Sequence, residues 1–227
     1  MICIVQARMG SLRLPGKTMK KLFGKSILSR VLERLRKSKK ITKIIIATSN
    51  TKKDDQIVNF CKKNNYSYFR ANLKNVLERF KKLVIKTKTK SFVRISADSP
   101  FIDPQIIDKA INIYIKKKAD IVTNIFPRTF PKGQSVEIID SKIFLKTCGM
   151  IKKKIEKEHI TKHFYNNHKK YKIINFSAPK NLNHLNQSID TIRDFEQAKK
   201  IISFSKNKFI GYKKIALLQT KEIGVIN

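Results

Sequence analysis

The chain opens with MICIVQARMGSLRLPGK, residues 1–17, and the character of this stretch changes halfway along it. Ile2 to Val5 form a short, unbroken apolar run rich in β-branched residues, which predicts a strand buried on both faces. The positions that follow combine cations, glycines, a hydroxyl and a proline: Arg8, Gly10, Ser11, Arg13, Pro15, Gly16 and Lys17. A cationic loop in which glycine lets the backbone approach a ligand suits a polyanion such as a triphosphate. The alternative is an ordinary solvated turn.

Apolar segments of strand and helix type alternate after this loop. Strands are predicted at 43–48, 67–69, 92–95 and 121–124, of which 67–69 is weak, and amphipathic helices at 27–38, 54–63, 76–84 and 104–114. This alternation predicts an α/β fold with a doubly wound, mostly parallel sheet of the Rossmann-like type. Further strands are predicted near 136–139, 171–176 and 185–189, and further helices at 158–167 and about 195–202.

Ligands of such a sheet gather at the carboxyl ends of its strands. Asp98 follows the strand at 92–95 and precedes a Ser-Pro turn, so its carboxylate can serve as a hard oxygen ligand for Mg²⁺. Alternatively, Asp98 caps that turn. Asp103, directly before Pro104, is better explained as a helix N-cap. Asp190 or Thr191 can cap the helix that follows them.

The length and composition of the chain limit the classes of protein to which it can belong. The 227 residues are enough for one α/β domain with a full core, and the net charge is +35. The excess is mostly lysine, accompanied by many Ile, Asn and Phe residues, a combination that AT-rich codons produce. Lysines also occupy nearly every predicted helix face instead of one stripe, so we expect no specific nucleic-acid partner. A basic nucleic-acid-binding protein is the less favoured alternative.

Cysteine and histidine patterns indicate the environment. Cys3, Cys61 and Cys148 are odd in number and scattered, which predicts neither a disulfide framework nor a metal site but a reducing cytoplasm. We expect no membrane partner, because no apolar run is long enough to span a bilayer and the N-terminus lacks a signal-peptide pattern. His159 and His163 have the spacing of a zinc pair, but no third ligand follows them.

The stretch from Gln6 to Lys17 resembles a known nucleotide-binding signature, [P/Q]-A-R-x-x-S-x-R-L-P-G-K, at every defined position. This signature is typical of the sugar cytidylyltransferases, which include the CMP-Kdo and acylneuraminate synthetases. The resemblance is closest to their bacterial branch related to spore-coat polysaccharide protein F. It implies a fold of the nucleotide-diphospho-sugar transferase type with a small β/α insertion. It also implies nucleotide binding by Gln6, Ala7, Arg8, Gly10, Ser11, Arg13 and Lys17, with Arg13 and Lys17 as catalytic residues.

Further motifs of this family have counterparts in the chain. The helix start at 75–80 resembles D-V-L-x-R-[FY], which implies a nucleotide contact for Arg79. The segment around Asp98 resembles R-x-[ST]-G-D-x-P-[LF]-[IV]-D, with Ala97 in place of glycine, which implies that Asp98 is a catalytic Mg²⁺ ligand. The segment around Asp190 resembles T-V-D-T-P-E-D-F-E, whose first aspartate is the second metal ligand.

Two segments resemble the family's sugar-site elements. Residues 130–138 resemble F-P-x-G-L-D-V-E-V, which implies substrate binding by Gly133 and Glu137. Gln134-Ser135 replaces Leu-Asp there, so one carboxylate is lost. Glu137 can equally be an exposed residue of an alternating strand. Residues 158–161 resemble E-H-[VI]-T, which implies a structural or sugar-contacting role for His159.

These observations predict one nucleotidyltransferase domain over residues 1–227. About 126–180 would form a sugar-site and dimerisation insertion, and 206–227 a tail without an assigned role. The resemblance implies transfer of CMP from CTP to a Kdo-, sialic- or pseudaminic-acid-like sugar, with release of pyrophosphate, for surface polysaccharide or glycan synthesis. It also implies a cytoplasmic homodimer. Alternatives are another nucleotide or a non-acid sugar or polyol acceptor. A glycosyltransferase would need a D-x-D metal motif, which the sequence lacks.

Overall fold

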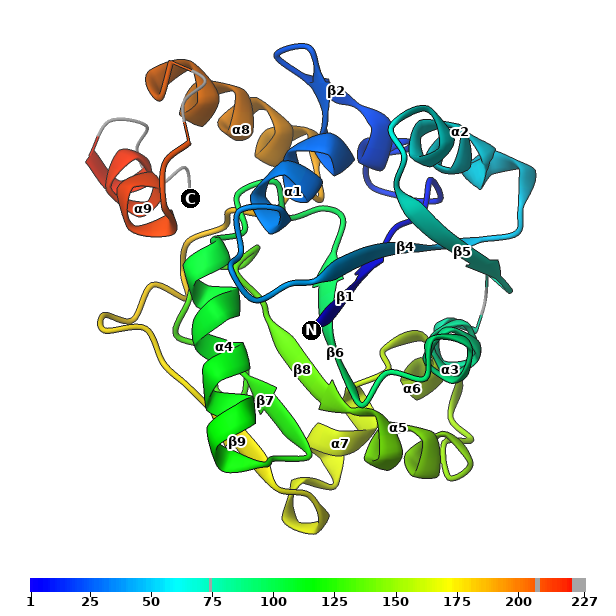
Figure 1. Ribbon diagram of the computed structural model, residues 1–227. Helices are drawn as coiled ribbons and strands as arrows, with labels where there is room; N and C mark the ends of the chain where they lie inside the picture. Colours follow the sequence, from blue (N-terminus) through cyan, green and yellow to red (C-terminus); the bar gives the residue numbers. More distant parts are fainter. Residues whose placement is uncertain (74, 207–208, 222–227) are drawn as a thin grey trace.

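The computed structural model describes residues 1–73, 75–206 and 209–221, which build a central sheet covered by helices on both faces (Figure 1). The sheet has seven strands among these residues, in the order β5-β4-β1-β6-β8-β7-β9. Their bounds are β1 Ile2–Gln6, β4 Lys43–Ser49, β5 Ser67–Ala71, β6 Ser91–Ser96, β7 Ile121–Thr123, β8 Glu137–Asp140 and β9 Ile173–Asn175. Only β8 runs antiparallel to its neighbours in this sheet. The predicted mostly parallel, Rossmann-like α/β fold is confirmed.

The buried strand β1 lies near the middle of the sheet, between β4 and β6. Alternate residues of β1 enter two separate apolar clusters: Cys3 and Val5 face one side, and Ile4 faces the other. Both faces are therefore sealed from water, which explains the unbroken apolar run of its sequence. The carboxyl end of β1 emerges between the ends of β4 and β6, where the basic loop begins.

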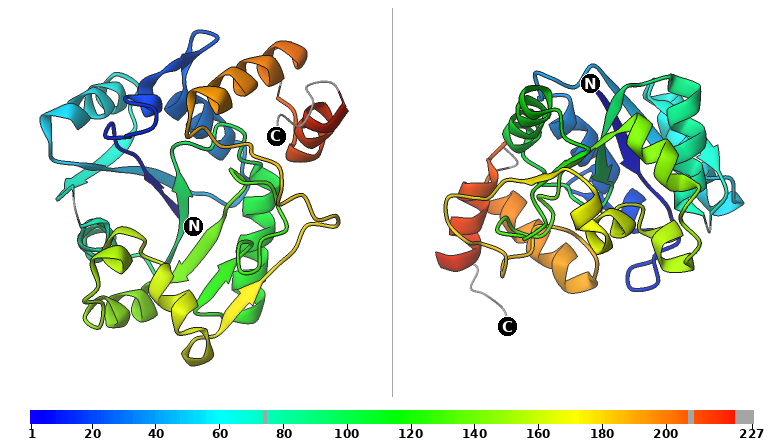
Figure 2. Two further views of the ribbon diagram at one scale, coloured as in Figure 1. Left: turned by 180° about the vertical axis from the view of Figure 1, so that it is seen from behind. Right: turned by 90° about the horizontal axis from the view of Figure 1, so that it is seen from below.

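Helices divide between the two faces of the sheet (Figures 1 and 2). The face of Cys3 is covered by α1 (Ile27–Leu35), α2 (Asp55–Lys63) and α4 (Pro104–Lys117). The face of Ile4 is covered by α3 (Val76–Thr87), α5 (Ser141–Cys148) and α7 (Lys162–Asn166), with α6 (Lys154–Glu158) packed beside α3. The apolar stripes of α1, α2, α3 and α4 match those predicted from the sequence, whereas no helix was predicted at the position of α5. No helix among the described residues is long and apolar enough to span a bilayer.

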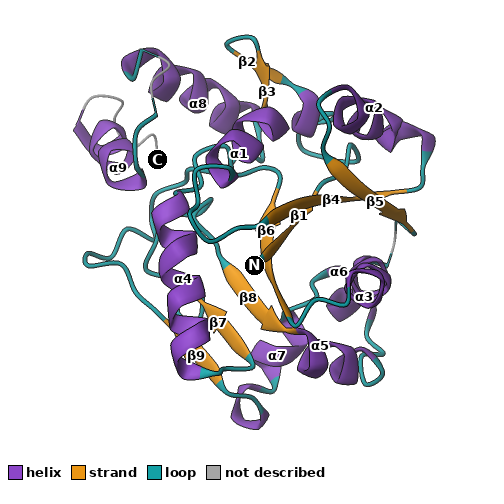
Figure 3. Ribbon diagram, viewed as in Figure 1, coloured by secondary structure: helices purple, strands orange, loops and turns teal. Residues whose placement is uncertain are grey.

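A third cluster joins the C-terminal helices to the N-terminal loop. Helices α8 (Ile192–Phe204) and α9 (Tyr212–Lys221) lie beside α1 and α4 (Figures 1 and 3). The cluster unites apolar residues of α8 and α9 with Leu14, Phe101 and Ile189. Asp103 contributes to this junction, because it caps α4 through Gln105 N and also accepts from Tyr212 N. Helix α9 lies within the segment 206–227, for which the sequence predicted no helix or strand.

Two sequence predictions were wrong. Residues 185–189 form no strand, apart from an isolated bridge between Lys132 and Asn186. The predicted helix over 158–167 is interrupted, because α6 ends at Glu158 and His159 adopts the non-helical angles φ −110° and ψ 82°. This break lets Ile160 turn into the core before α7 begins. A short hairpin of β2 (Lys21–Leu22) and β3 (Lys25–Ser26) and three 3-10 turns, Lys17–Met19, Lys52–Asp54 and His168–Lys170, complete the described elements.

Candidate nucleotide and metal site

The basic loop is held in a compact turn by its own backbone. Ser11 N and Gly16 N both donate to Met9 O, at 2.9 and 3.2 Å. Gly16 adopts φ 67°, a left-handed conformation that favours glycine. Gly10 has open space around the position that a Cβ would occupy, so packing does not require a glycine there. The turn exposes Arg8 and Arg13 while Lys17 points inward.

Asp54 fastens this loop to the end of β4. One carboxylate oxygen accepts from Met9 N at 2.7 Å, and the other accepts from Thr48 Oγ1 and Ser49 N, each at 2.9 Å. Burial alone would raise the pKa of Asp54, but these hydrogen bonds lower it below its ordinary value. Asp54 is therefore a charged anchor of the loop. Its sequence, Lys-Lys-Asp-Asp at a helix start, gave no sign of this role.

Lys17 joins the two aspartates that the sequence predicted to converge. Its Nζ lies 2.8 Å from Asp98 Oδ2, 2.8 Å from Asp190 Oδ1 and 2.9 Å from Ile189 O. Burial opposes the charge of Lys17, but the two carboxylates outweigh it and raise the pKa above its ordinary value. The structure therefore brings together residues from the loop after β1, the loop after β6 and the segment before α8.

Two further cations contact Asp190. Lys132 Nζ donates to its Oδ2, and Arg13 Nη2 lies 3.3 Å from its Oδ1. Burial alone would raise the pKa of Asp190, but Lys132 and Lys17 lower it to about 2. Sequence reasoning missed Lys132, which occupies the variable position of the F-P-x-G segment. A lysine there carries no signal of its own in a chain this rich in lysine.

Neither aspartate serves mainly as a helix cap. Thr191 caps α8 through Asp194 N, and the Asp194 carboxylate accepts from Asp190 N and Thr191 N. This capping box leaves the Asp190 side chain directed at Lys17. Asp98 Oδ1 accepts only from the neighbouring Ser99 hydroxyl, at 3.2 Å, while its Oδ2 faces Lys17.

This pair of carboxylates fits a divalent cation that also binds a substrate's phosphates. Mg²⁺ in nucleotide sites is commonly held by one or two carboxylates together with phosphate oxygens. The part of the chain that the structure describes contains no group of three or more His, Cys, Asp or Glu side chains arranged for a metal. Asp98 and Asp190, drawn together by one ammonium group, are the candidate ligands.

Arg79 lies buried beneath the loop. Its Nη2 donates to Asn72 O and Leu73 O, while its Nε and Nη1 are buried without a hydrogen-bond partner. Burial lowers its pKa, which the charge of Asp54 partly offsets. The charges of Asp54 and Arg8 both act on the pKa of Arg79. Arg79 is 0% exposed, so these donors are covered by the protein and do not face the open site.

Glu137 is not the exposed strand residue that one alternative predicted, since it is only 2% exposed. It forms an ion pair with Arg94, whose Nη2 donates to Gln6 Oε1 at 3.0 Å. Tyr165 also donates to Glu137, at 2.6 Å. The chain of contacts links the start of β8 to the end of β1, at the same edge of the sheet as Lys17.

The other predicted substrate residues are placed differently. A Cβ on Gly133, which has φ 93°, would lie 2.5 Å from the backbone of Gln187, so this glycine is required for the loop to pack. His159 is exposed just after α6. Its neighbour Glu158, not His159, contacts the basic loop, through Arg8 at 3.3 Å.

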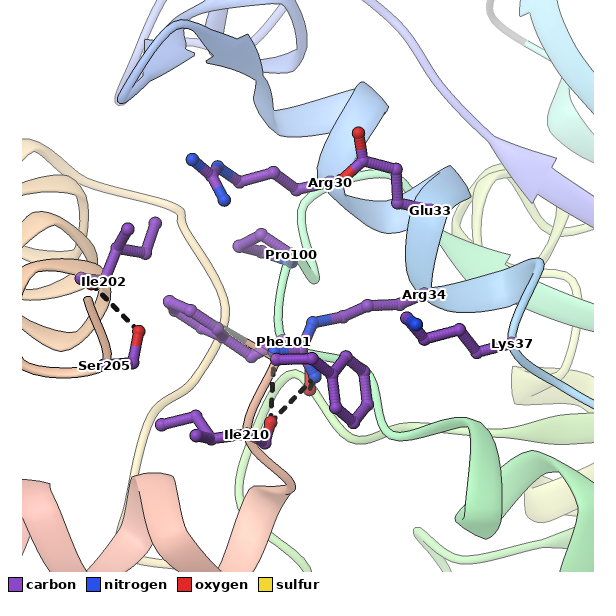
Figure 4. A pocket seen from close by; sticks show the side chains of 10 residues that line it. Arg30, Glu33, Arg34, Lys37, Pro100, Phe101, Ile202, Ser205 and Ile210 are labelled. Atoms are coloured by element: carbon purple, nitrogen blue, oxygen red, sulfur yellow. Dashed lines mark hydrogen bonds between the residues drawn. The ribbon is translucent and has the colours of Figure 1, made fainter. Parts of the chain in front are cut away.

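A separate pocket of about 280 Å³ lies between α1, Pro100-Phe101 and the C-terminal segment (Figure 4). The arginines that line this pocket already interact with other parts of the protein. The Arg34 guanidinium lies over the Phe209 ring and donates to Ile210 O at 3.1 Å, and Arg30 donates to Leu22 O. Its basic lining therefore ties α1 to neighbouring segments and is distinct from the Lys17 cluster.

Comparisons with known proteins show which proteins the chain is similar to. The sequence model of a family described as Cytidylyltransferase matches residues 2–225. The spore coat polysaccharide biosynthesis protein SpsF of Bacillus subtilis is 29% identical over 203 residues, covering 86% of this chain and 83% of that protein. A 3-deoxy-manno-octulosonate cytidylyltransferase of Syntrophotalea carbinolica is 28% identical over 108 residues, 48% of this chain and 42% of that enzyme. The solved structure of a cytidylyltransferase from Leptospira borgpetersenii has a TM-score of 0.90 and 30% identity, covering 94% of this chain and 91% of that one.

Proposed function

Because the chain belongs to the cytidylyltransferase family and is thus a nucleotidyltransferase, we propose that it transfers CMP from CTP to the hydroxyl of a sugar acid and releases pyrophosphate. One observation carries the proposal: Lys17 holds Asp98 and Asp190 together beside a cationic loop. An anionic nucleotide and a divalent cation need such a combination of charges in one place. The matches to SpsF and to a 3-deoxy-manno-octulosonate cytidylyltransferase support the substrate class.

The loop after β1 would bind the triphosphate. Arg8 and Arg13 are exposed cations on the turn, and Lys17 is the cation at its inner end. Ser11 Oγ accepts from Leu14 N at 3.3 Å, which leaves its hydroxyl proton for a phosphate oxygen. Gln6, Ala7 and Gly10 would contribute backbone or side-chain contacts to the nucleotide, and Arg79 a buried positive charge near the loop. In phosphoryl transfer, positioning and charge neutralisation supply most of the catalysis.

Asp98 and Asp190 would hold Mg²⁺, which when bound supplies positive charge to the phosphates. Lys17 stays protonated beside these carboxylates, because their charges raise its pKa. It would orient the α-phosphate and neutralise charge that builds up on it as the sugar hydroxyl attacks. Lys132 and Arg13, which both pair with Asp190, would add positive charge beside the phosphates.

The acceptor would lie along the edge of the sheet where β8 begins. Glu137 is fixed there by Arg94 and Tyr165, so it can orient a sugar hydroxyl directly or through these partners. Gly133 would shape the floor of this region through its close approach to Gln187. His159 would contact the acceptor from the segment after α6.

The decisive test is release of pyrophosphate by the purified protein with each of the four ribonucleoside triphosphates. Mixtures contain Mg²⁺ and one acceptor: 3-deoxy-manno-octulosonate, N-acetylneuraminate, a neutral sugar or a polyol. We expect release with CTP and a sugar acid, abolished by EDTA. Preference for another triphosphate would contradict the assignment of CTP. Turnover of a polyol alone would contradict the assignment of a sugar acid as acceptor. A thermal shift with each triphosphate and Mg²⁺ tests the nucleotide half without any acceptor.

We further propose a cytoplasmic homodimer with no membrane partner and no specific nucleic-acid partner, in which 126–180 contributes to the subunit contact. The three cysteines are free thiols, which fits a reducing compartment. Sedimentation equilibrium tests the dimer: a monomer at micromolar concentration would contradict it.

A further inference from the structure

Three glutamine side chains, called the glutamine chain below, form a buried row of amide groups. Gln134 lies in the loop before β8, Gln187 in the segment before α8, and Gln219 on α9. Their exposed fractions are 0%, 1% and 1%. Gln134 Nε2 donates to Gln187 Oε1 at 2.8 Å, and Gln187 Nε2 donates to Gln219 Oε1 at 3.2 Å. Burial of an amide is unfavourable unless it is hydrogen-bonded, so each of the three depends on its neighbours.

Backbone groups fix the direction of the glutamine chain. Gln134 Oε1 accepts from Asp103 N at 2.8 Å, and its Nε2 also donates to Phe101 O at 2.7 Å. A backbone N–H can only donate and a carbonyl can only accept, so the two ends of this amide cannot be exchanged. Gln187 Nε2 donates a second hydrogen bond, to Tyr212 O at 3.2 Å. An apolar side chain at position 134 or 187 would therefore leave buried partners unsatisfied.

The glutamine chain also fastens α9 to the rest of the fold. Gln219 Nε2 donates to Asn186 O at 2.7 Å, so Gln219 contacts both a side chain and the backbone of the segment before α8. At the start of the helix, Tyr212 N donates to Asp103 Oδ2 at 3.0 Å. Polar contacts near both ends of α9 therefore hold it to the two segments that carry the candidate metal ligands.

The position of Asp190 depends on these contacts between loops. Asp190 comes three positions after Gln187, in a segment that belongs to no strand of the described sheet. The backbone of this segment is tied to two loops instead. Gln187 N donates to Lys132 O at 2.7 Å. Ile189 N donates to Asp98 O at 2.8 Å. The separation of the two aspartates is thus set by the packing of loops that the glutamine chain joins through side chains.

We propose that the glutamine chain positions Asp190 against Asp98, which makes α9 part of the structure that binds the divalent cation. The inference rests on the proposed function and deepens it. Gln134, Gln187 and Gln219 are too buried to touch a ligand, so they act through the carboxylates. One cation can bridge two carboxylates only if their separation is kept within narrow limits, and a fully paired polar network supplies that rigidity.

The test measures CTP binding by isothermal titration calorimetry without an acceptor, in EDTA and in Mg²⁺. The ratio of the two dissociation constants is the Mg²⁺ gain, which Asp190→Asn should abolish. Gln187→Met keeps the length of the side chain but removes its amide. It should weaken CTP binding in Mg²⁺ roughly 10- to 100-fold, the usual effect of losing a residue that orients a metal ligand, and leave binding in EDTA unchanged. The Mg²⁺ concentration that gives half-maximal pyrophosphate release should rise with it.

Two further variants separate positioning from stability. Ser38→Ala removes a buried hydroxyl that contacts Asp108 and Ile41 N, at the amino end of β4 and away from the site. It should lower the melting temperature without changing the Mg²⁺ gain. Gln219→Met leaves the contact between Gln134 and Gln187 in place and should also reduce the Mg²⁺ gain, which provides the comparison if Gln187→Met does not fold.

The outcomes are distinct. A full Mg²⁺ gain in folded Gln187→Met or Gln219→Met would overturn the inference. So would an equal weakening of CTP binding in Mg²⁺ and in EDTA, or a loss of the Mg²⁺ gain in Ser38→Ala as large as in the glutamine variants, because either would indicate a role in stability alone. A wild-type protein whose affinity for CTP does not rise with Mg²⁺ would instead count against the proposed function.

Discussion

Asp98 and Asp190 share a single ammonium group: Lys17 Nζ lies 2.8 Å from an oxygen of each. Asp98 follows β6, and Asp190 precedes α8, so nothing but the tertiary fold brings them together. The two carboxylates face three cations here, because Arg13 and Lys132 also pair with Asp190. The carboxylate oxygens suit a divalent cation, and the surrounding cations suit the phosphates that accompany such a cation.

Replacing Arg13 with alanine tests the triphosphate loop. The Arg13 side chain is 64% exposed, so the fold should be unaffected. CTP binding should weaken by roughly 1.5–3 kcal/mol, the value of a charge-assisted hydrogen bond. Isothermal titration calorimetry with CTP and Mg²⁺ measures the change, and Arg193→Ala, an exposed arginine on α8, is the matched control. Unchanged affinity for CTP in a folded Arg13→Ala protein would contradict a role for Arg13 in nucleotide binding.

The meeting of Asp98 and Asp190 was predicted from the sequence, but the pairing of Lys17 with both was not. The strand-end rule accounts for Asp98 after β6 and for the loop of Lys17 after β1. It does not account for Asp190, because the strand predicted before this residue is absent from the described sheet. The motif resemblance then selected Asp98 and Asp190 from several aspartates that can also act as caps. Asp103 shows that this choice was needed, because the structure does use it as the N-cap of α4.

Residues 185–189 show why a pattern can mislead. Leu185, Gln187 and Ile189 alternate and are all buried, as in a half-buried strand. An alternating pattern shows which side chains face the core, but it does not show which backbone groups the segment hydrogen-bonds to. Here Gln187 N donates to Lys132 O, and Ile189 N donates to Asp98 O, so the segment bridges two loops instead of entering the sheet. Glu137, likewise, could not be placed by alternation, because its burial depends on the distant Arg94.

Asp54 should prove necessary for nucleotide binding although it lies outside the predicted site. Asp54→Ala leaves Met9 N, Ser49 N and the Thr48 hydroxyl without their charged acceptor. We expect a loss of about 3 kcal/mol in the free energy of unfolding and weaker CTP binding, because the loop loses its anchor. Urea denaturation and CTP titration measure the two effects. Asp55→Ala removes an exposed carboxylate next to it and should change neither by more than about 1 kcal/mol.

Asp190 should make stability depend on pH in the acid range. Its pKa is about 2 in the folded protein, below the ordinary value of 3.8, so folding favours the ionised form. The resulting stabilisation is complete above about pH 4 and is lost as the pH falls towards 2. Unfolding free energies of wild type and Asp190→Asn should therefore converge between pH 4 and 2. A difference that stays constant over this range would show that Lys17 and Lys132 do not favour the charged carboxylate.

Binding to DNA should be weak despite the net charge of +35. Counterion release makes such binding steeply dependent on salt and independent of sequence. Fluorescence anisotropy with labelled duplexes at two salt concentrations measures both properties. Tight binding to one sequence at physiological salt would favour the nucleic-acid-binding alternative over an enzyme.

Asp98→Asn and Asp190→Asn test whether the two carboxylates act as one unit. Either change removes one negative charge and one hard oxygen donor from the point that Lys17 marks. Mg²⁺-dependent pyrophosphate release should collapse in each single variant, whereas CTP should still bind through Arg8, Arg13 and Lys17. The double variant should be little worse than either single one, because residues that act together fail together.

Stability measurements separate this outcome from a structural role. If the aspartates serve only as turn or helix caps, each substitution should lower the free energy of unfolding by about 1 kcal/mol and leave the Mg²⁺ dependence unchanged. Asp194→Asn provides the comparison, since it disrupts the capping box of α8 without touching Lys17. Near-normal turnover in either Asp98→Asn or Asp190→Asn, with a competent acceptor, would refute a shared metal, because one ligand of a two-carboxylate site cannot be spared.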